Sequence, residues 1–345
     1  MSLQVSSRLN DEMIGKWDAF VQAHPKGSVL QSWNMYSIFK DTKCFEPLVV
    51  FCTEENDLVG LVSGVIIKEG KGIKGMFSSR LVVYGGPLIT PLHPEKSKIC
   101  DLLLGQLVSV TSNKAIFSQF RAAFDMREFS ECFLKYDFKW YPRLNLLIDT
   151  SNPEGVFRNL SGSRKRQIKK SIQNGAEIIE AQSAGQVHEF YLILRDLYRL
   201  KVKKPLPDFS FFNAFFYNAV KQNLGKILLV QYEGKIIGGI LCPFMSGKSM
   251  FEWYVCGLDR DYNEKGIYPS VLATWAAIDY ATRNNISLFD FMGLGKPDVD
   301  YGVRDFKLRF GGSVVNHGRM IRINMPLTYW ISELGFNLLS AIRKI

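Results

Sequence analysis

The same order of helices and strands is expected twice along this chain. The phrase DLVGLVSGVII at 57–67 resembles GKIIGGILCPF at 234–244, and NKAIFSQF at 113–120 resembles NNISLFDF at 284–291. The two pairs are offset by 177 and 171 residues. Short strand-like phrases also match by chance, but the matching order of the elements around them supports a duplication. We therefore infer two copies of one α/β unit.

Each copy is expected to form one domain, because 345 residues exceed the usual size of a single domain. The first domain is placed at 1–150 and the second at 151–322. Residues 323–345 are expected to form an amphipathic helix that packs back on the first domain, and contact with a membrane surface is the alternative. Its apolar positions are Leu327, Trp330, Ile331, Leu334, Leu338, Leu339 and Ile342.

Hydrophobic periodicity and capping residues predict the individual elements. In the first half, helices are expected at 11–23, 32–40 and 94–110, and strands at 47–52, 58–67, 81–84, 114–120, 138–141 and 144–148. In the second half, helices are expected at 153–173, 184–201, 209–222 and 268–283, and strands at 226–232, 236–244, 249–256 and 286–291.

Several classes of protein are disfavoured by the sequence. It has no run of about 18 apolar residues and no signal peptide at its start, so we expect a soluble, cytoplasmic protein. Its six cysteines form no CxxC pair and its four histidines lie far apart, so neither a metal site nor a disulfide framework is expected. There is no GxxxxGK[ST] phosphate-binding loop and no GxSxG nucleophile motif.

Positive charge is concentrated in the second half. Residues 1–150 carry 17 Lys and Arg against 16 Asp and Glu, whereas residues 151–345 carry 26 against 17. The excess suits an anionic partner such as a nucleotide, a phosphorylated lipid precursor, RNA or a membrane surface. A solvated basic surface that only maintains solubility is the alternative.

The densest basic segment is RKRQIKK at 164–170. On a helix, Arg164 falls into an apolar stripe formed by Val156, Leu160, Ile168 and Ile172. A buried arginine is costly unless it reaches solvent or meets an anion or a carboxylate. Arg164 is therefore a candidate ligand-binding residue, whereas a solvated helix face explains its basic neighbours.

The order of strand, hairpin, strand and helix resembles acetyltransferases of the GNAT type, in which backbone amides at a helix start hold the pyrophosphate of the acyl donor. The corresponding loop here is GLDRDYNEKGIYPSVL at 257–272. It has one glycine near the helix start, and Pro269 removes an amide donor. This loop matches the pyrophosphate signature poorly, which argues against acetyl-CoA.

A more specific resemblance is to the Fem-type aminoacyltransferases, which have tandem GNAT-like domains. It rests on LSGSRKRQIKKSIQNGAEI, FYLILRDLYRL, PSVLATWAAIDYA, FDFMG and GVRDFKLRFGG in the second half, and on GSVLQSWNMYSIFK and VYGGPL in the first. It implies an α/β fold of two such domains with mixed, mostly antiparallel sheets. The implied activity, which needs no cofactor or metal, is transfer of an amino acid from aminoacyl-tRNA to an amino group of a nucleotide- or lipid-linked peptidoglycan precursor.

The resemblance also implies roles for particular residues. Phe306 and Lys307 match the catalytic pair of the family, and the lysine cation could stabilise the oxyanion formed when the amine attacks the ester carbonyl. A surface charge on a helix is the alternative for Lys307. Residues expected to bind substrate are Arg199, Lys40, Tyr254 and Arg164, with the first contacting a phosphate of the acceptor. Asp290 is expected to brace the following loop through its backbone amides.

Two other functions remain open. The first is an acyl-CoA-dependent N-acyltransferase acting on a sugar nucleotide, a lipid or another amine. The second is a non-catalytic protein that binds RNA or anionic lipid through the basic segment at 164–170.

Overall fold

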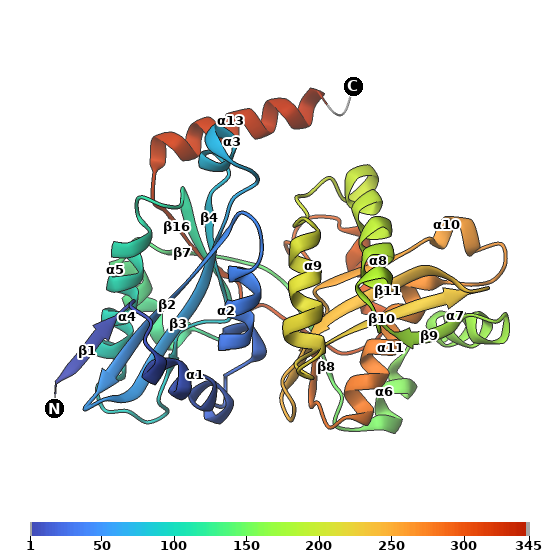
Figure 1. The fold of residues 1–345 in the computed structure, drawn as a ribbon, viewed down its shortest axis with the longest axis horizontal. Coiled ribbons are helices and arrows are strands. Elements are labelled where there is room, and N and C mark those ends of the chain that lie inside the picture. The colour runs from blue at the N-terminus through green and yellow to red at the C-terminus, as the bar shows by residue number, and fades with distance from the viewer. Residues whose placement is uncertain (1, 343–345) are drawn as a thin grey trace. The chain divides into compact units, whose positions relative to one another are not determined.

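The computed structural model describes residues 2–342 and divides the chain into two compact α/β units (Figure 1). Unit 1 contains the residues up to Pro142 and those from His317 on, and unit 2 contains Arg143–Asn316. Both units combine helices with a mixed, mostly antiparallel set of strands, which confirms the expected fold class.

Unit 1 is built on one sheet with the strand order β1-β2-β3-β4-β6-β16-β7, in which β5 also pairs with β3 and only β4 and β6 pair in parallel. Its strands are β1 (Leu3–Ser6), β2 (Phe45–Glu54), β3 (Asp57–Ile67), β4 (Arg80–Tyr84), β5 (Leu88–Ile89), β6 (Phe117–Arg121), β7 (Lys139–Tyr141) and β16 (Arg319–Ile323). Its helices are α1 (Asp11–Ala23), α2 (Trp33–Lys40), α3 (Gly72–Met76), α4 (Lys96–Thr111), α5 (Ser130–Lys135) and α13 (Pro326–Ile342).

Alternate residues of β2 serve the two faces of the unit 1 sheet. Val50 and Cys52 pack in one cluster with α4, whereas the ring of Phe51 contacts Trp17 of α1 with 5.3 Å between ring centroids. The strand is apolar on both faces because helices cover both, as Figure 1 shows for α4 on one side and α1 and α2 on the other.

Unit 2 has two groups of paired strands, β13-β11-β10-β9 and β12-β14-β8-β15. The strands are β8 (Asn145–Asp149), β9 (Glu177–Glu180), β10 (Gly225–Tyr232), β11 (Lys235–Pro243), β12 (Ser249–Phe251), β13 (Tyr254–Gly257), β14 (Leu288–Asp290) and β15 (Ser313–Val315). The helices are α6 (Pro153–Asn159), α7 (Gly162–Gln173), α8 (Ala184–Leu197), α9 (Phe209–Phe215), α10 (Asp259–Tyr262), α11 (Pro269–Arg283) and α12 (Gly302–Leu308).

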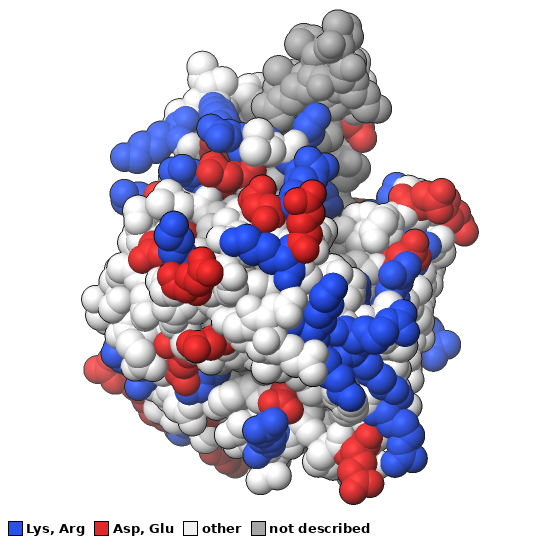
Figure 2. Space-filling model, turned by 90° about the vertical axis from the view of Figure 1, so that its right-hand side faces the viewer, with Lys and Arg blue, Asp and Glu red and all other residues white. Residues whose placement is uncertain are grey.

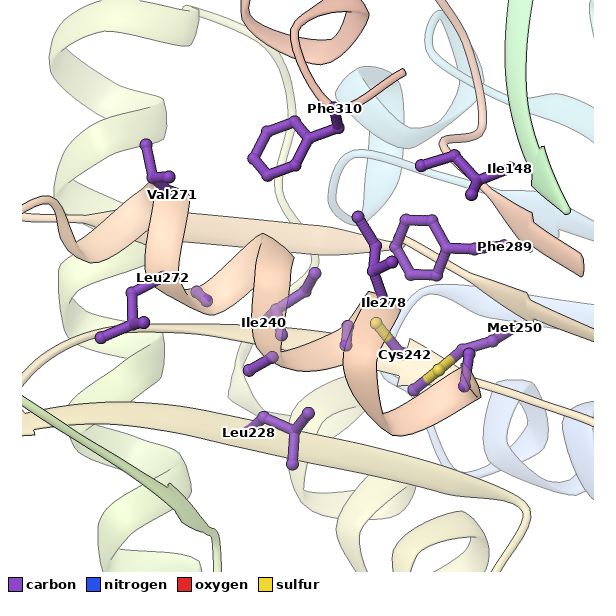
Figure 3. Packing of buried hydrophobic residues seen from close by; sticks show 14 of the residues in the cluster. Ile148, Leu228, Ile240, Cys242, Met250, Val271, Leu272, Ile278, Phe289 and Phe310 are labelled. Atoms are coloured by element: carbon purple, nitrogen blue, oxygen red, sulfur yellow. The ribbon is translucent and has the colours of Figure 1, made fainter. Parts of the chain in front are cut away.

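The core of unit 2 lies between α11 and the strands. Figure 3 shows Leu272 and Ile278 of α11 in the same layer as Leu228 and Ile240 of the sheet, with Phe289 of β14 beside them. Alanines 273, 276, 277 and 281 on α11 are buried, and their small side chains let the helix approach the strands closely. The apolar run predicted at 286–291 forms β14 at Leu288–Asp290, in which Phe289 and Asp290 are buried and Leu288 is half-buried.

The two units repeat one strand arrangement. In unit 1, β16 lies between β6 and β7, and in unit 2, β8 lies between β14 and β15. In each unit, the middle strand comes directly after the other unit in the chain: β16 follows unit 2, and β8 follows the first part of unit 1. This repetition supports the inferred duplication. The two compact units meet at residues 142 and 316, whereas the sequence placed the boundaries at 150 and 322.

Four predicted elements differ from the expectation. The helix expected at 153–173 breaks at Leu160, and Ser161 caps α7 by accepting the amide of Arg164 at 3.3 Å. The helices after 184 and 209 end in π-helical turns at Tyr198–Val202 and Phe216–Val220. The strand expected at 249–256 breaks at Glu252 and Trp253, and this interruption positions the candidate site.

The C-terminal helix α13 forms as expected, but the packing of its apolar side chains differs from the expectation. Leu327, Trp330, Ile331 and Leu334 are exposed, whereas Tyr329 contacts Phe117 of unit 1 with 5.9 Å between ring centroids. The side chains of Leu338, Leu339 and Ile342 lie outside the described residues. Within the described part of the chain, no helix has the length and apolar character needed to cross a membrane.

The two first-half motifs of the resemblance meet in unit 1. Gln31 of GSVLQSW donates its amide to the backbone oxygen of Gly86 in VYGGPL at 3.0 Å. Gly85 has a φ of +96°, and a Cβ added there would lie 2.9 Å from Nε2 of Gln31. The glycine is thus required both by the backbone conformation and by the side chain that covers it.

Candidate active site

The candidate site lies where two neighbouring strands of unit 2 diverge. β12 pairs in parallel with β14, whereas β13, two residues later, pairs with β11. The amide of Glu252 donates to the oxygen of Asp290 at 2.9 Å, and the next amide, that of Trp253, donates to Leu241 at 3.1 Å. The backbone therefore leaves one strand group for the other at Glu252.

Lys307 of α12 reaches this point of divergence. Its Nζ forms an ion pair with Oε1 of Glu252 at 2.9 Å and donates to the oxygens of Phe291 at 2.7 Å and Gly293 at 3.2 Å. The two charged side chains are 11% and 3% exposed. The alternative of a surface charge is therefore wrong for Lys307, because its ammonium group is buried at the end of β14.

Burial dominates the electrostatics of Glu252. Removal from water raises the pKa of its carboxyl, and the charge of Lys307 opposes this rise. Its second oxygen, Oε2, is buried and has no hydrogen-bond partner among the described residues. A buried carboxylate of this kind is stable mainly beside its cation, so Glu252 and Lys307 form one electrostatic unit.

Asp290 braces the loop after β14, as predicted. Its Oδ1 accepts the backbone amide of Met292 at 2.6 Å and the side-chain amide of Asn145 at 2.7 Å. Burial raises the pKa of this carboxyl against these hydrogen bonds. Asp290 therefore supports the segment whose carbonyl groups hold Lys307.

Arg304 holds the part of this loop at 294–299, and it was not identified from the sequence as a candidate site residue. Its guanidinium donates to the backbone oxygens of Leu294 at 3.1 Å, Pro297 at 3.2 Å and Val299 at 3.1 Å, and also to that of Lys296. This part of the loop after β14 is thus fixed by one side chain from α12. The motif GVRDFK contains Arg304, but only the final structure of the loop reveals its partners.

Arg164 is buried beside Phe306, as its position in an apolar stripe suggested, but among the described residues it forms no ion pair with a carboxylate. Its guanidinium carbon lies 4.4 Å from the ring centroid of Phe306 and 5.0 Å from that of Phe310, and Nη2 donates to the oxygen of Phe306 at 3.0 Å. Burial lowers the pKa of Arg164 to about 10. Aromatic faces and a carbonyl thus take the place of the expected counterion.

Tyr254 begins β13 and belongs to an aromatic cluster. Its ring lies 5.3 Å from that of Phe212 and 6.1 Å from that of Tyr198, between centroids. Burial raises the pKa of Tyr198 to about 12, so its hydroxyl stays protonated at neutral pH. Phe211, Phe212 and Phe215 of α9 are buried core residues.

The two remaining predicted residues are exposed. The side chain of Arg199 is 70% exposed and lies 3.3 Å from Asp196, within the π-helical turn after α8. Lys40 ends α2 in unit 1 and is also exposed. The structure brings Lys307, Phe306 and Arg164 together within unit 2, and it does not place Arg199 in contact with them.

An acidic side chain accepts hydrogen bonds from the first turn of α11. Asp259 accepts the amide of Ser270 at 3.1 Å and also the hydroxyl of Ser270, while Pro269 has no amide hydrogen. The amide of Tyr268 donates to Ser171 at 2.9 Å. The amides of Tyr268 and Ser270 are thus occupied, and the carboxylate of Asp259 lies at the start of the helix, where a pyrophosphate would require free amides.

No cluster of metal ligands accompanies the site. In the part of the chain that the structure describes, no three His, Cys, Asp or Glu side chains come together as they would around a metal ion. The thiols of Cys242 and Cys256 are buried, and burial raises the pKa of both.

Comparison with known proteins identifies the fold. No protein-family model matches the sequence, and no curated protein matches it either. Among solved structures, FemX matches with a TM-score of 0.71 at 14% identity, over 96% of this chain and 100% of FemX. A tandem GNAT protein from the clavulanic acid biosynthesis pathway matches with a TM-score of 0.59 at 10% identity, over 94% and 99%.

A third similar structure is the C-terminal domain of a putative lysylphosphatidylglycerol synthetase from Agrobacterium fabrum. It matches with a TM-score of 0.56 at 11% identity, over 91% of this chain and 92% of that domain. At these identities the matches show a shared fold. The chain therefore has the Fem-like fold of two tandem GNAT-like domains, as the sequence motifs suggested.

Proposed function

We propose that this chain is an aminoacyltransferase that moves an amino acid from aminoacyl-tRNA to an amino group of a peptidoglycan precursor. The observation that carries the proposal is the buried cation of Lys307, held at the strand divergence of a FemX-like fold. A fixed cation in a site of low polarity is suited to stabilise negative charge that develops on a carbonyl oxygen.

The reaction requires one acyl transfer. The acceptor nitrogen attacks the ester carbonyl carbon, an amide C–N bond forms, and the C–O bond to the ribose of the tRNA breaks. The proton lost by the amine ends on the ribose oxygen, so the transfer involves no change of oxidation state.

Lys307 would stabilise the intermediate oxyanion. Of its three hydrogen-bond partners, the oxygen of Gly293 is the most distant, at 3.2 Å, so a substrate oxygen would most easily replace this contact. The ion pair with Glu252 holds the ammonium group in place, which makes Glu252 a positioning residue. Arg304 and Asp290 hold the loop that supplies the two carbonyl contacts.

The closed start of α11 favours an aminoacyl-tRNA donor over an acyl-CoA donor. Asp259 occupies the amide of Ser270 and adds a negative charge at this position in unit 2. The pyrophosphate of coenzyme A would meet that carboxylate. The fold itself does not distinguish the donors, since both FemX and a tandem GNAT protein share it.

The peptidoglycan precursor is proposed as the acceptor because the fold is similar to that of FemX. Arg199 and Lys40 are proposed to contact the phosphates of this precursor. Both are exposed cations, as such contacts require. The fold of a lysylphosphatidylglycerol synthetase domain, named for an aminoacylated lipid, is also similar. A lipid acceptor is therefore included in the test.

The test incubates purified protein with each charged tRNA and with nucleotide-linked muropeptide, lipid-linked muropeptide or phosphatidylglycerol. Loss of the label from the tRNA and a matching mass gain of the muropeptide are expected, and Lys307→Ala should abolish both. If no charged tRNA supports transfer to either muropeptide, the proposal is wrong. Thermal stabilisation by acyl-CoA, with acyl transfer from it, would support the N-acyltransferase alternative.

A further inference from the structure

The outward face of α7 carries a row of cations. Lys165, Arg166, Lys169 and Lys170 are spaced so that they share one side of the helix. Lys165 is half-buried and the other three are exposed. Among the residues that the structure describes, no carboxylate forms an ion pair with any of these four.

Lys265 extends this row beyond the helix. Lys170 packs against Gly266, and the side-chain amide of Asn174 at the end of α7 donates to the oxygen of Lys265 at 2.6 Å. We call Lys165, Arg166, Lys169, Lys170 and Lys265 the α7 basic surface. Figure 2 shows Lys and Arg side chains gathered into one blue area on this side of unit 2, at the level of α7 in Figure 1.

The α7 basic surface works against the stability of the helix. Lys165 and Lys169 are like charges at positions i and i+4, and so are Arg166 and Lys170. Such pairs destabilise a helix, and acidic residues at either position would relieve the repulsion. Lys165 donates to the backbone oxygen of Arg158 at 2.8 Å, but within the described chain no carboxylate neutralises any of the four charges. The charges therefore indicate an anionic partner.

The opposite face of the same helix reaches the candidate site. Arg164 donates to the oxygen of Phe306, which precedes Lys307. A helix with its side chains is about 10 Å across, so an anion on the α7 basic surface would lie about one helix diameter from Phe306. A partner bound there is close enough to be part of the substrate itself.

The composition of this face distinguishes between anionic partners. Ile168 of α7 is buried in the core, and Ile172 is its one exposed aliphatic side chain. A membrane-binding helix instead presents an apolar face that enters the lipid. Five cations in a row also exceed the needs of a single diphosphate and suit the repeated phosphates of a nucleic acid backbone.

We propose that the α7 basic surface binds the sugar-phosphate backbone of RNA, namely the acceptor stem of the donor tRNA. This inference rests on the proposed function, because that function supplies a donor with a duplex next to its reactive end. Double-stranded RNA is recognised largely through phosphate and ribose contacts, so the interaction is expected to be strongly dependent on salt and weakly dependent on sequence.

The test measures binding of deacylated bulk tRNA and of an acceptor-stem hairpin by fluorescence anisotropy at several salt concentrations. The variant carries K165E, R166E, K169E and K170E. The matched control reverses four other exposed lysines, as K71E, K74E, K139E and K235E. Circular dichroism verifies that both variants fold.

We expect the α7 variant to bind the hairpin at least about tenfold more weakly. Its affinity should also depend less on salt, with the magnitude of the slope of log K against log salt reduced by about three. The control should retain most of the affinity. An equal loss in both variants, or unchanged RNA binding by the α7 variant, would overturn the inference. So would selective loss of binding to phosphatidylglycerol vesicles, which would identify a membrane surface.

The same variants separate this inference from the proposed function. If the α7 variant transfers amino acids with an unchanged KM for charged tRNA, the RNA surface is wrong although the activity stands. If the α7 variant loses RNA binding but wild-type protein transfers nothing, the surface stands and the activity is wrong. Lys307→Ala should bind the hairpin as wild type does.

Discussion

Nζ of Lys307 lies 2.9 Å from Oε1 of Glu252, and this buried ion pair joins α12 to the interruption between β12 and β13. Removing one partner of such a pair leaves the other charge uncompensated, which is far more destabilising than replacing both partners by neutral groups. Lost activity in a variant of Lys307 alone therefore has two explanations, lost chemistry and lost stability. The two can be separated with a paired substitution.

Lys307→Met should lower the free energy of unfolding by about 3 kcal/mol, because Glu252 stays buried without its cation. Adding Glu252→Gln should restore most of this loss, since no buried charge remains. Both variants should transfer at least about 100-fold more slowly than wild type, because both lack the cation that faces the oxyanion. Urea unfolding and the charged-tRNA assay measure the two effects. Normal transfer by the double variant would exclude a catalytic role for Lys307.

The stability difference between wild type and Lys307→Met should grow with pH. Burial raises the pKa of Glu252 even beside Lys307, and loss of the lysine should raise it further. A carboxyl whose pKa is raised on folding stabilises the protein fully below its unfolded pKa of about 4.3 and loses that contribution as pH rises through the folded value.

Thermal unfolding from about pH 4.5 to about pH 8 measures this dependence. The difference should be small at the acid end and largest at the alkaline end, and it should stay flat for the double variant with Glu252→Gln. A difference that shrinks with rising pH would mean that another group controls the stability of Lys307→Met.

Arg304→Ala should release the loop after β14 with little effect on the stability of unit 2. The guanidinium contacts four carbonyl oxygens of 294–299 and forms no ion pair with a described residue. We expect faster proteolysis within 294–301 and about tenfold slower transfer, since the loop also supplies the oxygen of Gly293 to Lys307. Arg309→Ala, at an exposed position in the same unit, is the control. Unchanged proteolysis would show that the loop is held by its other contacts.

Periodicity was sufficient to predict most elements of this fold, because the buried strands and amphipathic helices follow the two spacings that helices and strands impose. The prediction of one continuous strand at 249–256 was wrong at Glu252. The interruption arises because β12 pairs with β14 and β13 with β11, and these partners are distant in sequence. The domain boundaries differed for the same reason. The pairing of β8 with β14 and of β16 with β6 cannot be read from local pattern.

The candidate site was predicted in part. The resemblance brought forward Lys307 and Phe306, and the apolar stripe singled out Arg164, but Glu252 and Arg304 were missed. A single glutamate at the end of a strand and an arginine in a loop motif have ordinary local explanations, and their partners become visible only in three dimensions. The one local signal for Glu252 was a charge between the apolar runs SMF and YVCG.

The covered turn at Gly85 offers a test of unit 1 that is independent of the active site. Gly85→Ala should lower the free energy of unfolding by about 2–3 kcal/mol, because φ is +96° and the new Cβ would lie 2.9 Å from the amide of Gln31. Adding Gln31→Ala should remove the steric part of the loss and leave the backbone strain. Gly72→Ala is the control, since its φ is +60° and the space beside it is open, and it should cost about 1 kcal/mol. Chemical denaturation of the four proteins measures these differences, and a Gly85→Ala variant no less stable than Gly72→Ala would mean that Gln31 yields without cost.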